Sequence, residues 1–127
     1  MRTLYIFTLI MISSLAKSQN LNCSDFKIGT FRIETTNIKT PIFTMIRTEK
    51  IQKESAVEIK MEVEGTIEWK SECSYELTYT KSVSPEMIGK KISAEIIKIE
   101  GRKAICKATS AEVLKGFTLE FEMEKLN

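Results

Sequence analysis

The chain has 127 residues, with 19 lysines and arginines against 17 aspartates and glutamates, and it contains no histidine. Two of the basic residues, Arg2 and Lys17, fall in an N-terminal segment that we expect to be removed, so the remaining domain is close to neutral. A neutral domain has no overall attraction to nucleic acid or to anionic membranes. The lack of histidine removes the commonest general base and metal ligand. We therefore expect a monomer with no cofactor and no nucleic-acid partner.

The first 18 residues have the order of a secretory signal peptide. Arg2 gives a positive start, an apolar run follows over 4–15, and small residues come after it. The run is shorter than the roughly 20 residues that span a bilayer, and no later run reaches that length. We expect residues 1–18 to be removed, residues 19–127 to form a single domain, and the protein to be exported to the periplasm or the cell exterior. The alternative is an uncleaved N-terminal anchor.

Beyond this segment, apolar and polar residues alternate with the period of β-strands. The clearest stretch is "VEIKMEVEGTIEWK", which is apolar on one face and charged on the other, as expected for a strand buried on one side. Gly65 interrupts it without changing the alternation, which suggests a bend or a close backbone approach. The predicted strands cover 28–36, 42–54, 57–70, 74–82, 90–100, 103–110 and 117–125.

Short connections link these strands. The segment "SPEMIG" at 84–89 predicts a single helical turn, since serine, proline and glycine suit its cap, first residue and exit. Gly101 marks a hairpin, and the apolar face switches between Ile96 and Ile97, which predicts a bulge. The fold class is therefore all-β, an antiparallel meander of about seven to eight strands curled into a small barrel. The predicted buried side chains are Ile59, Met61, Val63, Ile67, Trp69, Leu77, Leu119 and Phe121, and the predicted exposed ones are Glu62, Glu68, Glu76 and Glu122.

Two resemblances extend this interpretation. The segment "FKIGTFRIE", with Gly29 and Phe31, resembles the first strand of lipocalin-type barrels. The order of "CSDFKIGTF", "IRTEKIQKE", "IEWKSECSYELTY", "MIGKKI" and "LEFEMEKLN" resembles a group of small, exported, uncharacterised bacterial proteins. Some of these relatives carry a DNA topoisomerase label. An exported, short and neutral chain without an acidic metal cluster argues against that activity, so the resemblance implies a lipocalin-like barrel and no activity.

Three cysteines follow the signal segment, which leaves one disulfide and one free thiol as the simplest arrangement outside the cytosol. Cys73 sits between Glu72 and Glu76, which disfavours a reactive thiol, so we interpret it as half of a structural disulfide. Its partner is Cys23 or Cys106, and a seven-strand meander places Cys23 and Cys73 at opposite ends of the barrel. The resembling proteins imply the Cys23–Cys73 pair, which leaves Cys106 as a buried thiol.

The sequence contains no motif for catalysis. We find no phosphate-binding loop, dinucleotide fingerprint or nucleophile elbow, and no pair of inward carboxylates. Three separated cysteines make a poor zinc site. We expect a protein that is not an enzyme and holds no metal. One hypothesis is a barrel that binds a small apolar or amphipathic ligand; the other is a packed structural or interaction module of the cell envelope, whose partner is an envelope protein. The candidate ligand-binding residues are Arg47, Trp69, Tyr75, Tyr79, Phe117 and Phe121.

Arg47 has two interpretations. It shares the alternation of Phe43, Met45 and Ile51, so it would point inward. Beside an acid such as Glu49, it could there hold a carboxylate ligand. Because "TMIRTEKI" does not alternate cleanly, Arg47 could equally be a surface charge.

Overall fold

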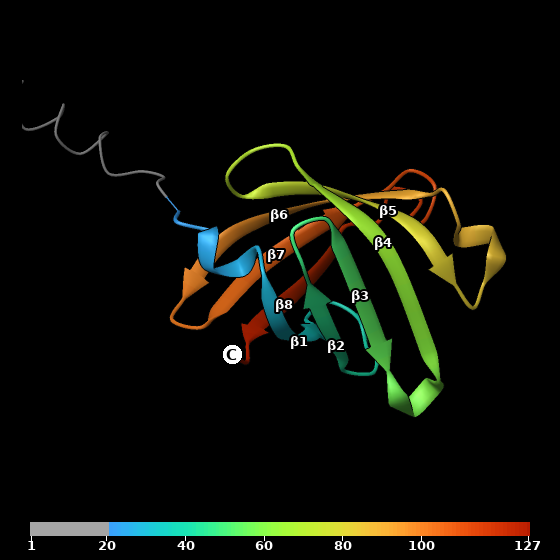
Figure 1. Cartoon of the computed structure of the whole chain (residues 1–127), viewed down its shortest axis with the longest axis horizontal. Coiled ribbons are helices and arrows are strands. Elements are labelled where there is room, and N and C mark those ends of the chain that lie inside the picture. The colour runs from blue at the N-terminus through green and yellow to red at the C-terminus, as the bar shows by residue number, and fades with distance from the viewer. Residues whose placement is uncertain (1–20) are drawn as a thin grey trace, which may run out of the picture.

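A computed structural model describes residues 21–127 as an eight-stranded antiparallel meander that closes into a barrel (Figure 1). Each strand pairs with the next, and β8 pairs with β1, so no sheet edge is left open. This confirms the all-β barrel. The predicted signal segment, residues 1–18, lies outside the described residues. The strands are β1 (Gly29–Thr35), β2 (Phe43–Arg47), β3 (Ile51–Ala56), β4 (Met61–Trp69), β5 (Ser74–Ser82), β6 (Lys91–Glu100), β7 (Lys103–Thr109) and β8 (Leu119–Lys125).

The predicted strand over 42–54 is wrong, because the chain reverses at residues 48–50 and forms β2 and β3 in its place. The Thr48 N–H donates to the Ile51 carbonyl at 2.9 Å and closes this turn. The predicted start of the next strand is also wrong. Residues Val57–Ile59 form a 3-10 turn in which Ile59 is exposed, so β4 begins only at Met61.

Two predicted irregularities are confirmed. In β6 the register shifts between Ile96 and Lys98, so Ile97 bulges outward while Ile96 is buried. In β4, a Cβ atom on Gly65 would lie 2.6 Å from the carbonyl oxygen of Thr78, so only glycine allows this approach of β4 to β5. The predicted helical turn is present as the 3-10 helix η3 (Pro85–Met87).

The inward face follows the alternation in most strands. Of the side chains predicted to be buried, Val63, Ile67, Leu77 and Phe121 are buried, whereas Met61, Trp69 and Leu119 are half-buried. Glu62 and Glu68 are exposed as predicted. Glu76 and Glu122 are half-buried on the outer face, where their carboxylates lie 3.5 Å from Lys91 and 4.0 Å from Lys103.

The two ends of the barrel differ. At one end the N-terminal segment 21–28, which we call the plug, contains the 3-10 helix η1 (Ser24–Phe26) and lies among the short turns of the barrel (Figure 1). Cys23 and Phe26 of the plug are buried in the main core. The other end, which we call the loop end, carries every second connection of the meander. These connections are 36–42, 57–60, 83–90 and 110–118. The plug therefore closes one end, and only the loop end can admit a ligand.

Candidate functional site

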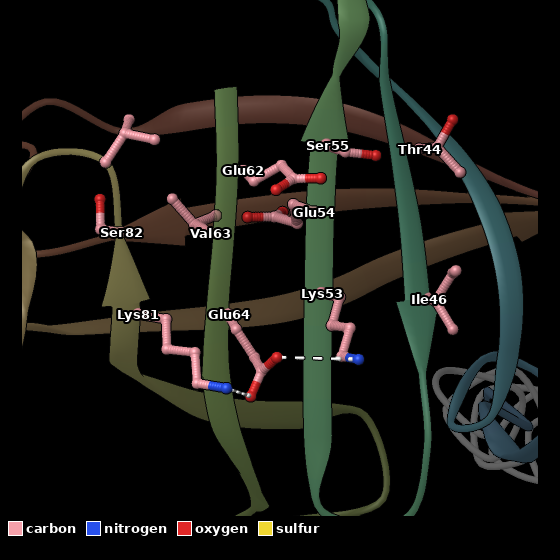
Figure 2. Close-up of a pocket in the computed structure, with 11 residues that line it drawn as sticks. Thr44, Ile46, Lys53, Glu54, Ser55, Glu62, Val63, Glu64, Lys81 and Ser82 are labelled. Atoms are coloured by element: carbon pink, nitrogen blue, oxygen red, sulfur yellow. Dashed lines mark ion pairs between the residues drawn. The ribbon is translucent and has the colours of Figure 1, made fainter. Parts of the chain in front are cut away.

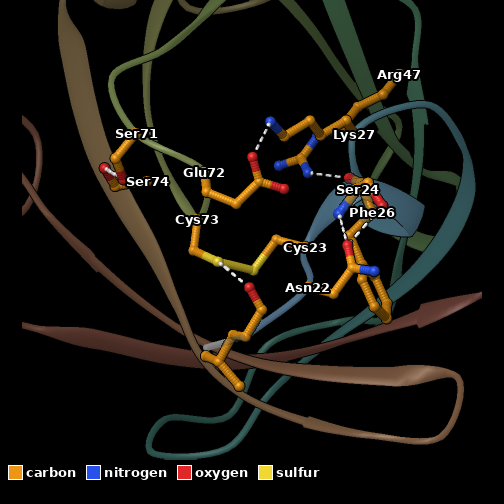
Figure 3. The surroundings of a disulfide bond; sticks show 11 residues. Asn22, Cys23, Ser24, Phe26, Lys27, Arg47, Ser71, Glu72, Cys73 and Ser74 are labelled. Carbon is orange, nitrogen blue, oxygen red and sulfur yellow. Dashed lines mark hydrogen bonds and ion pairs between the residues drawn. A yellow bond between two sulfur atoms is a disulfide. The ribbon is translucent and has the colours of Figure 1, made fainter. Parts of the chain in front are cut away.

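The plug is fastened by a disulfide between Cys23 and Cys73, with the two Cα atoms 5.4 Å apart (Figure 3). The pairing implied by the resemblance is thus present. The seven-strand meander, which placed Cys23 and Cys73 at opposite ends of the barrel, is wrong by one strand. Because 42–54 forms two strands, Cys73 lies in the fourth turn of the meander, at the same end as Cys23. Cys106 is free and buried among the described residues.

Polar contacts of the plug add to the disulfide. The Lys27 ammonium lies 3.3 Å from a carboxylate oxygen of Glu72 and 4.9 Å from the centre of the Trp69 ring. Inside the barrel, the Phe26 ring stacks on Phe31 with ring centres 6.1 Å apart. These contacts hold the plug against both the turns and the core.

Arg47 is buried, with 1% of its surface exposed, so the inward interpretation of this residue is correct. Its Nε donates to Oε1 of Gln52 and its Nη1 donates to the carbonyl of Phe26, both at 2.8 Å. Its Nη2 has no hydrogen-bond partner within residues 21–127. The expected acidic neighbour, Glu49, is instead exposed in the turn after β2.

Aromatic rings surround the guanidinium of Arg47. Its central carbon lies 4.3 Å from the ring centre of Tyr75, 5.5 Å from that of Trp69 and 5.8 Å from that of Phe31. Such contacts stabilise a cation through the negative faces of the rings. Arg47 is therefore held in place by the protein, as part of the floor of the interior.

Above this floor, the barrel contains a cavity of about 290 Å³ that extends to the loop end. This volume lies near the lower limit of typical small-molecule pockets, and the walls are largely apolar, as in such pockets. The lining residues are Ile33, Thr35, Ile38, Thr40, Phe43, Met45, Gln52, Glu54, Met61, Tyr75, Leu77, Tyr79, Met87, Ile92, Ala94, Ala108, Val113, Leu114, Leu119 and Phe121.

Glu54 is the single charged residue among these described lining residues. It follows Gln52 by two positions on β3, and its half-buried side chain borders both the interior cavity and a hollow on the outer face of the barrel. Burial raises the pKa of Glu54, and the nearby positive charge of Arg47 opposes this shift. Burial also raises the pKa of Tyr75 to about 12 and raises the pKa of Tyr79, where the negative charge of Glu54 adds to the effect. The charges of Arg47 and Glu54 therefore act on the polar groups that line the cavity.

A second hollow of about 470 Å³ lies on the outer face of β2–β5 (Figure 2). Three of its charged side chains form ion pairs, since Glu64 lies 3.8 Å from both Lys53 and Lys81, and Glu54 and Glu62 also line it. Both lysines are exposed to solvent. This hollow is larger than the interior cavity, but it is a solvated strand surface, and we take the interior cavity as the candidate site.

The candidate ligand-binding residues separate into three groups. Tyr75, Tyr79 and Phe121 line the cavity. Arg47 and Trp69 belong to the floor below the cavity, where they contact the plug. Phe117 is exposed in the β7–β8 connection, so its expected inward position is wrong.

The sequence analysis missed Gln52 and Glu54. Both share the alternation of the buried residue Ala56, which could have identified them as inward. The turn at 48–50 hides this signal, because it shifts the alternation in the middle of the single strand predicted over 42–54.

Comparisons with protein-family models and with curated proteins find no match. Within residues 21–127, no helix has the length and apolar character needed to cross a membrane. The same residues contain no group of three or more acidic or cysteine side chains arranged to hold a metal ion. The function therefore has to be argued from the cavity and the plug.

Proposed function

We propose that this protein is an exported, non-enzymatic barrel that binds a small apolar or amphipathic molecule in its interior cavity. The observation that supports this most directly is the cavity itself, about 290 Å³ of mainly apolar space inside a barrel of only eight strands. Small barrels of this strand number are either filled by side chains or hold one small ligand. The remaining space favours the ligand.

Export is part of the same proposal. The Cys23–Cys73 disulfide suggests an oxidising compartment, since cytosolic thiols are kept reduced. The signal-like sequence of residues 1–18 points in the same direction. Mass analysis of the protein recovered from the envelope or the medium should find a chain that begins near Gln19, and retention of Met1 there would contradict export by cleavage.

Binding can be tested by filling the cavity. Native mass spectrometry of protein purified from its own envelope fraction should show an adduct of on the order of ten non-hydrogen atoms, at the roughly 30 Å³ that each atom occupies in a liquid. Ala108 lines the cavity, so Ala108→Leu should abolish the adduct. Ala111 is exposed in the β7–β8 connection, and Ala111→Leu is the matched control that should retain it. An unmodified mass for the wild-type protein would count against the proposal.

A second function is favoured by exposed apolar residues at the loop end. Val57 is 90% exposed and Val83 is 65% exposed, and Ile59 and Ile88 are exposed beside them in sequence. Exposed apolar patches mark interaction sites. An interaction module would bind an envelope protein here, and co-purification of such a partner should then fail for Val57→Lys with Val83→Lys while any cavity adduct persists.

A further inference from the structure

The Glu54 carboxylate has no partner of its own inside the barrel. Within residues 21–127 it forms no hydrogen bond and no ion pair within 4 Å, although it lines the cavity. Glu54 is half-buried, so its carboxylate keeps part of its contact with water. An occupant of the cavity would displace some of that water, and a hydrogen-bond donor on the occupant would replace it. Glu54 is therefore the charged side chain that an occupant of the cavity would contact.

Arg47 does not supply these donors. Two of its three nitrogens are committed to Gln52 and to the carbonyl of Phe26, and its flat face lies against Tyr75. Arg47 does not itself line the cavity. It acts on Glu54 as a nearby positive charge, which lowers the carboxyl pKa against the effect of burial.

These two side chains balance each other in charge. A cationic head group would pair with the carboxylate of Glu54 and leave the buried positive charge of Arg47 without an anion. An anionic head group would meet the carboxylate of Glu54 before it could approach the guanidinium. In a largely apolar cavity, both arrangements leave one uncompensated charge, which is costly. An uncharged hydrogen-bond donor satisfies Glu54 and keeps the interior neutral.

Resting on the proposed function, we propose that the occupant is a small uncharged amphipathic molecule whose hydroxyl or amide N–H donates a hydrogen bond to the Glu54 carboxylate. Its apolar part lies against the side chains between the floor and the loop end, among them Phe43, Leu119 and Phe121. The cavity has room for on the order of ten non-hydrogen atoms. This is the size of a medium-chain alcohol or amide.

The test compares three probes that share one alkyl chain: 1-nonanol, nonanoate and nonylammonium. Each is titrated calorimetrically into the full exported protein at about pH 8, a value chosen because burial raises the pKa of Glu54 above its usual range of about 4.3. We expect 1-nonanol to bind about tenfold or more tightly than either ion, because each ion leaves one uncompensated charge in the cavity. Equal or tighter binding of an ion overturns the head-group assignment and leaves the proposed function intact. No binding of any probe overturns the proposed function itself.

A substitution then tests whether Glu54 is responsible. Glu54→Gln keeps the shape of the side chain but leaves the charge of Arg47 uncompensated, so nonanoate should gain about tenfold relative to 1-nonanol. Glu62 is an exposed carboxylate on the adjacent strand β4, and Glu62→Gln is the matched control that should leave the order of the three probes unchanged. An unchanged ratio of the nonanoate and 1-nonanol affinities in Glu54→Gln, with a native near-ultraviolet spectrum, contradicts the role of Glu54.

Discussion

Nη1 of Arg47 donates a 2.8 Å hydrogen bond to the backbone carbonyl of Phe26, so a strand of the barrel holds the plug from the inside. The same guanidinium binds Gln52 on β3 through its Nε. Arg47 thus joins three segments that are distant in the sequence: the plug, β2 and β3. It also supplies the positive charge next to the carboxylate on the cavity wall.

Replacement of Arg47 by leucine should lower the free energy of unfolding by about 3–5 kcal/mol, because Glu54 would lose its counter-charge and two buried acceptors would lose their donor. Urea denaturation measures the change. Arg32, whose ion pair with Glu34 is exposed, is the control, and Arg32→Leu should cost less than about 1 kcal/mol. Similar losses for both variants would show that Arg47 has no special structural role. The double variant Arg47→Leu with Glu54→Leu should recover part of the loss.

Removal of the disulfide should also destabilise the barrel. The bond joins residues 50 positions apart, and the loop-entropy model gives about 4 kcal/mol for a closure of this length. We expect the Cys23→Ser, Cys73→Ser variant to lose a stability of this order in urea denaturation. Treatment of the wild-type protein with a reductant should reproduce the loss. If reduction left the midpoint unchanged, the plug would have to be held by its polar contacts alone.

Cys106 should be unreactive in the native protein. It is fully buried, and burial raises its pKa to about 12, so almost no thiolate is present at neutral pH. A thiol reagent at about pH 8 should modify no cysteine in the folded protein and one after denaturation without reductant. Rapid modification of the native protein would place Cys106 at an accessible position and would contradict the barrel register around it.

The stability of the protein should fall as the pH rises above the ordinary range of a carboxyl group. Burial raises the folded-state pKa of Glu54, so the folded protein binds a proton that the unfolded chain releases at lower pH. The stability that Glu54 contributes is therefore fully present below the pKa of its carboxyl group in the unfolded chain. It is lost as the pH rises through the pKa of that group in the folded protein. Denaturation midpoints of the wild type and Glu54→Gln, measured from acidic to mildly alkaline pH, should diverge in this direction. Parallel pH profiles would mean that Glu54 is well hydrated.

Gly65→Ala should cost about 1–3 kcal/mol, the range for overpacking a closely packed site. The added Cβ would lie 2.6 Å from the Thr78 carbonyl and 2.9 Å from Leu77, and both belong to the neighbouring strand β5. Thr66 is exposed next to it, so Thr66→Ala is the matched control and should change stability by less than about 0.5 kcal/mol. Thermal denaturation measures both. A neutral Gly65→Ala would show that the two strands can separate at this point without loss.

The sequence by itself determined the class of fold, because apolar and polar residues that alternate with a period of two indicate which face of each strand is buried. The inward residues Val63 and Ile67 of β4 could be predicted, and so could the bulge after Ile96 in β6 and the close approach at Gly65. These features are local, since each depends on a few neighbouring residues and on one buried face.

The tertiary structure alone decided the features that depend on closure of the barrel. The reversal at residues 48–50 lacks a glycine or proline, and it is stabilised by the pairing of β2 and β3 with strands on either side. That one turn brings Cys73 to the end where Cys23 lies, and it places Glu54 on the cavity wall near Arg47. Contacts of this kind join residues far apart in the chain, so no local pattern specifies them. They are fixed only when the eight strands close and bring their inward faces together.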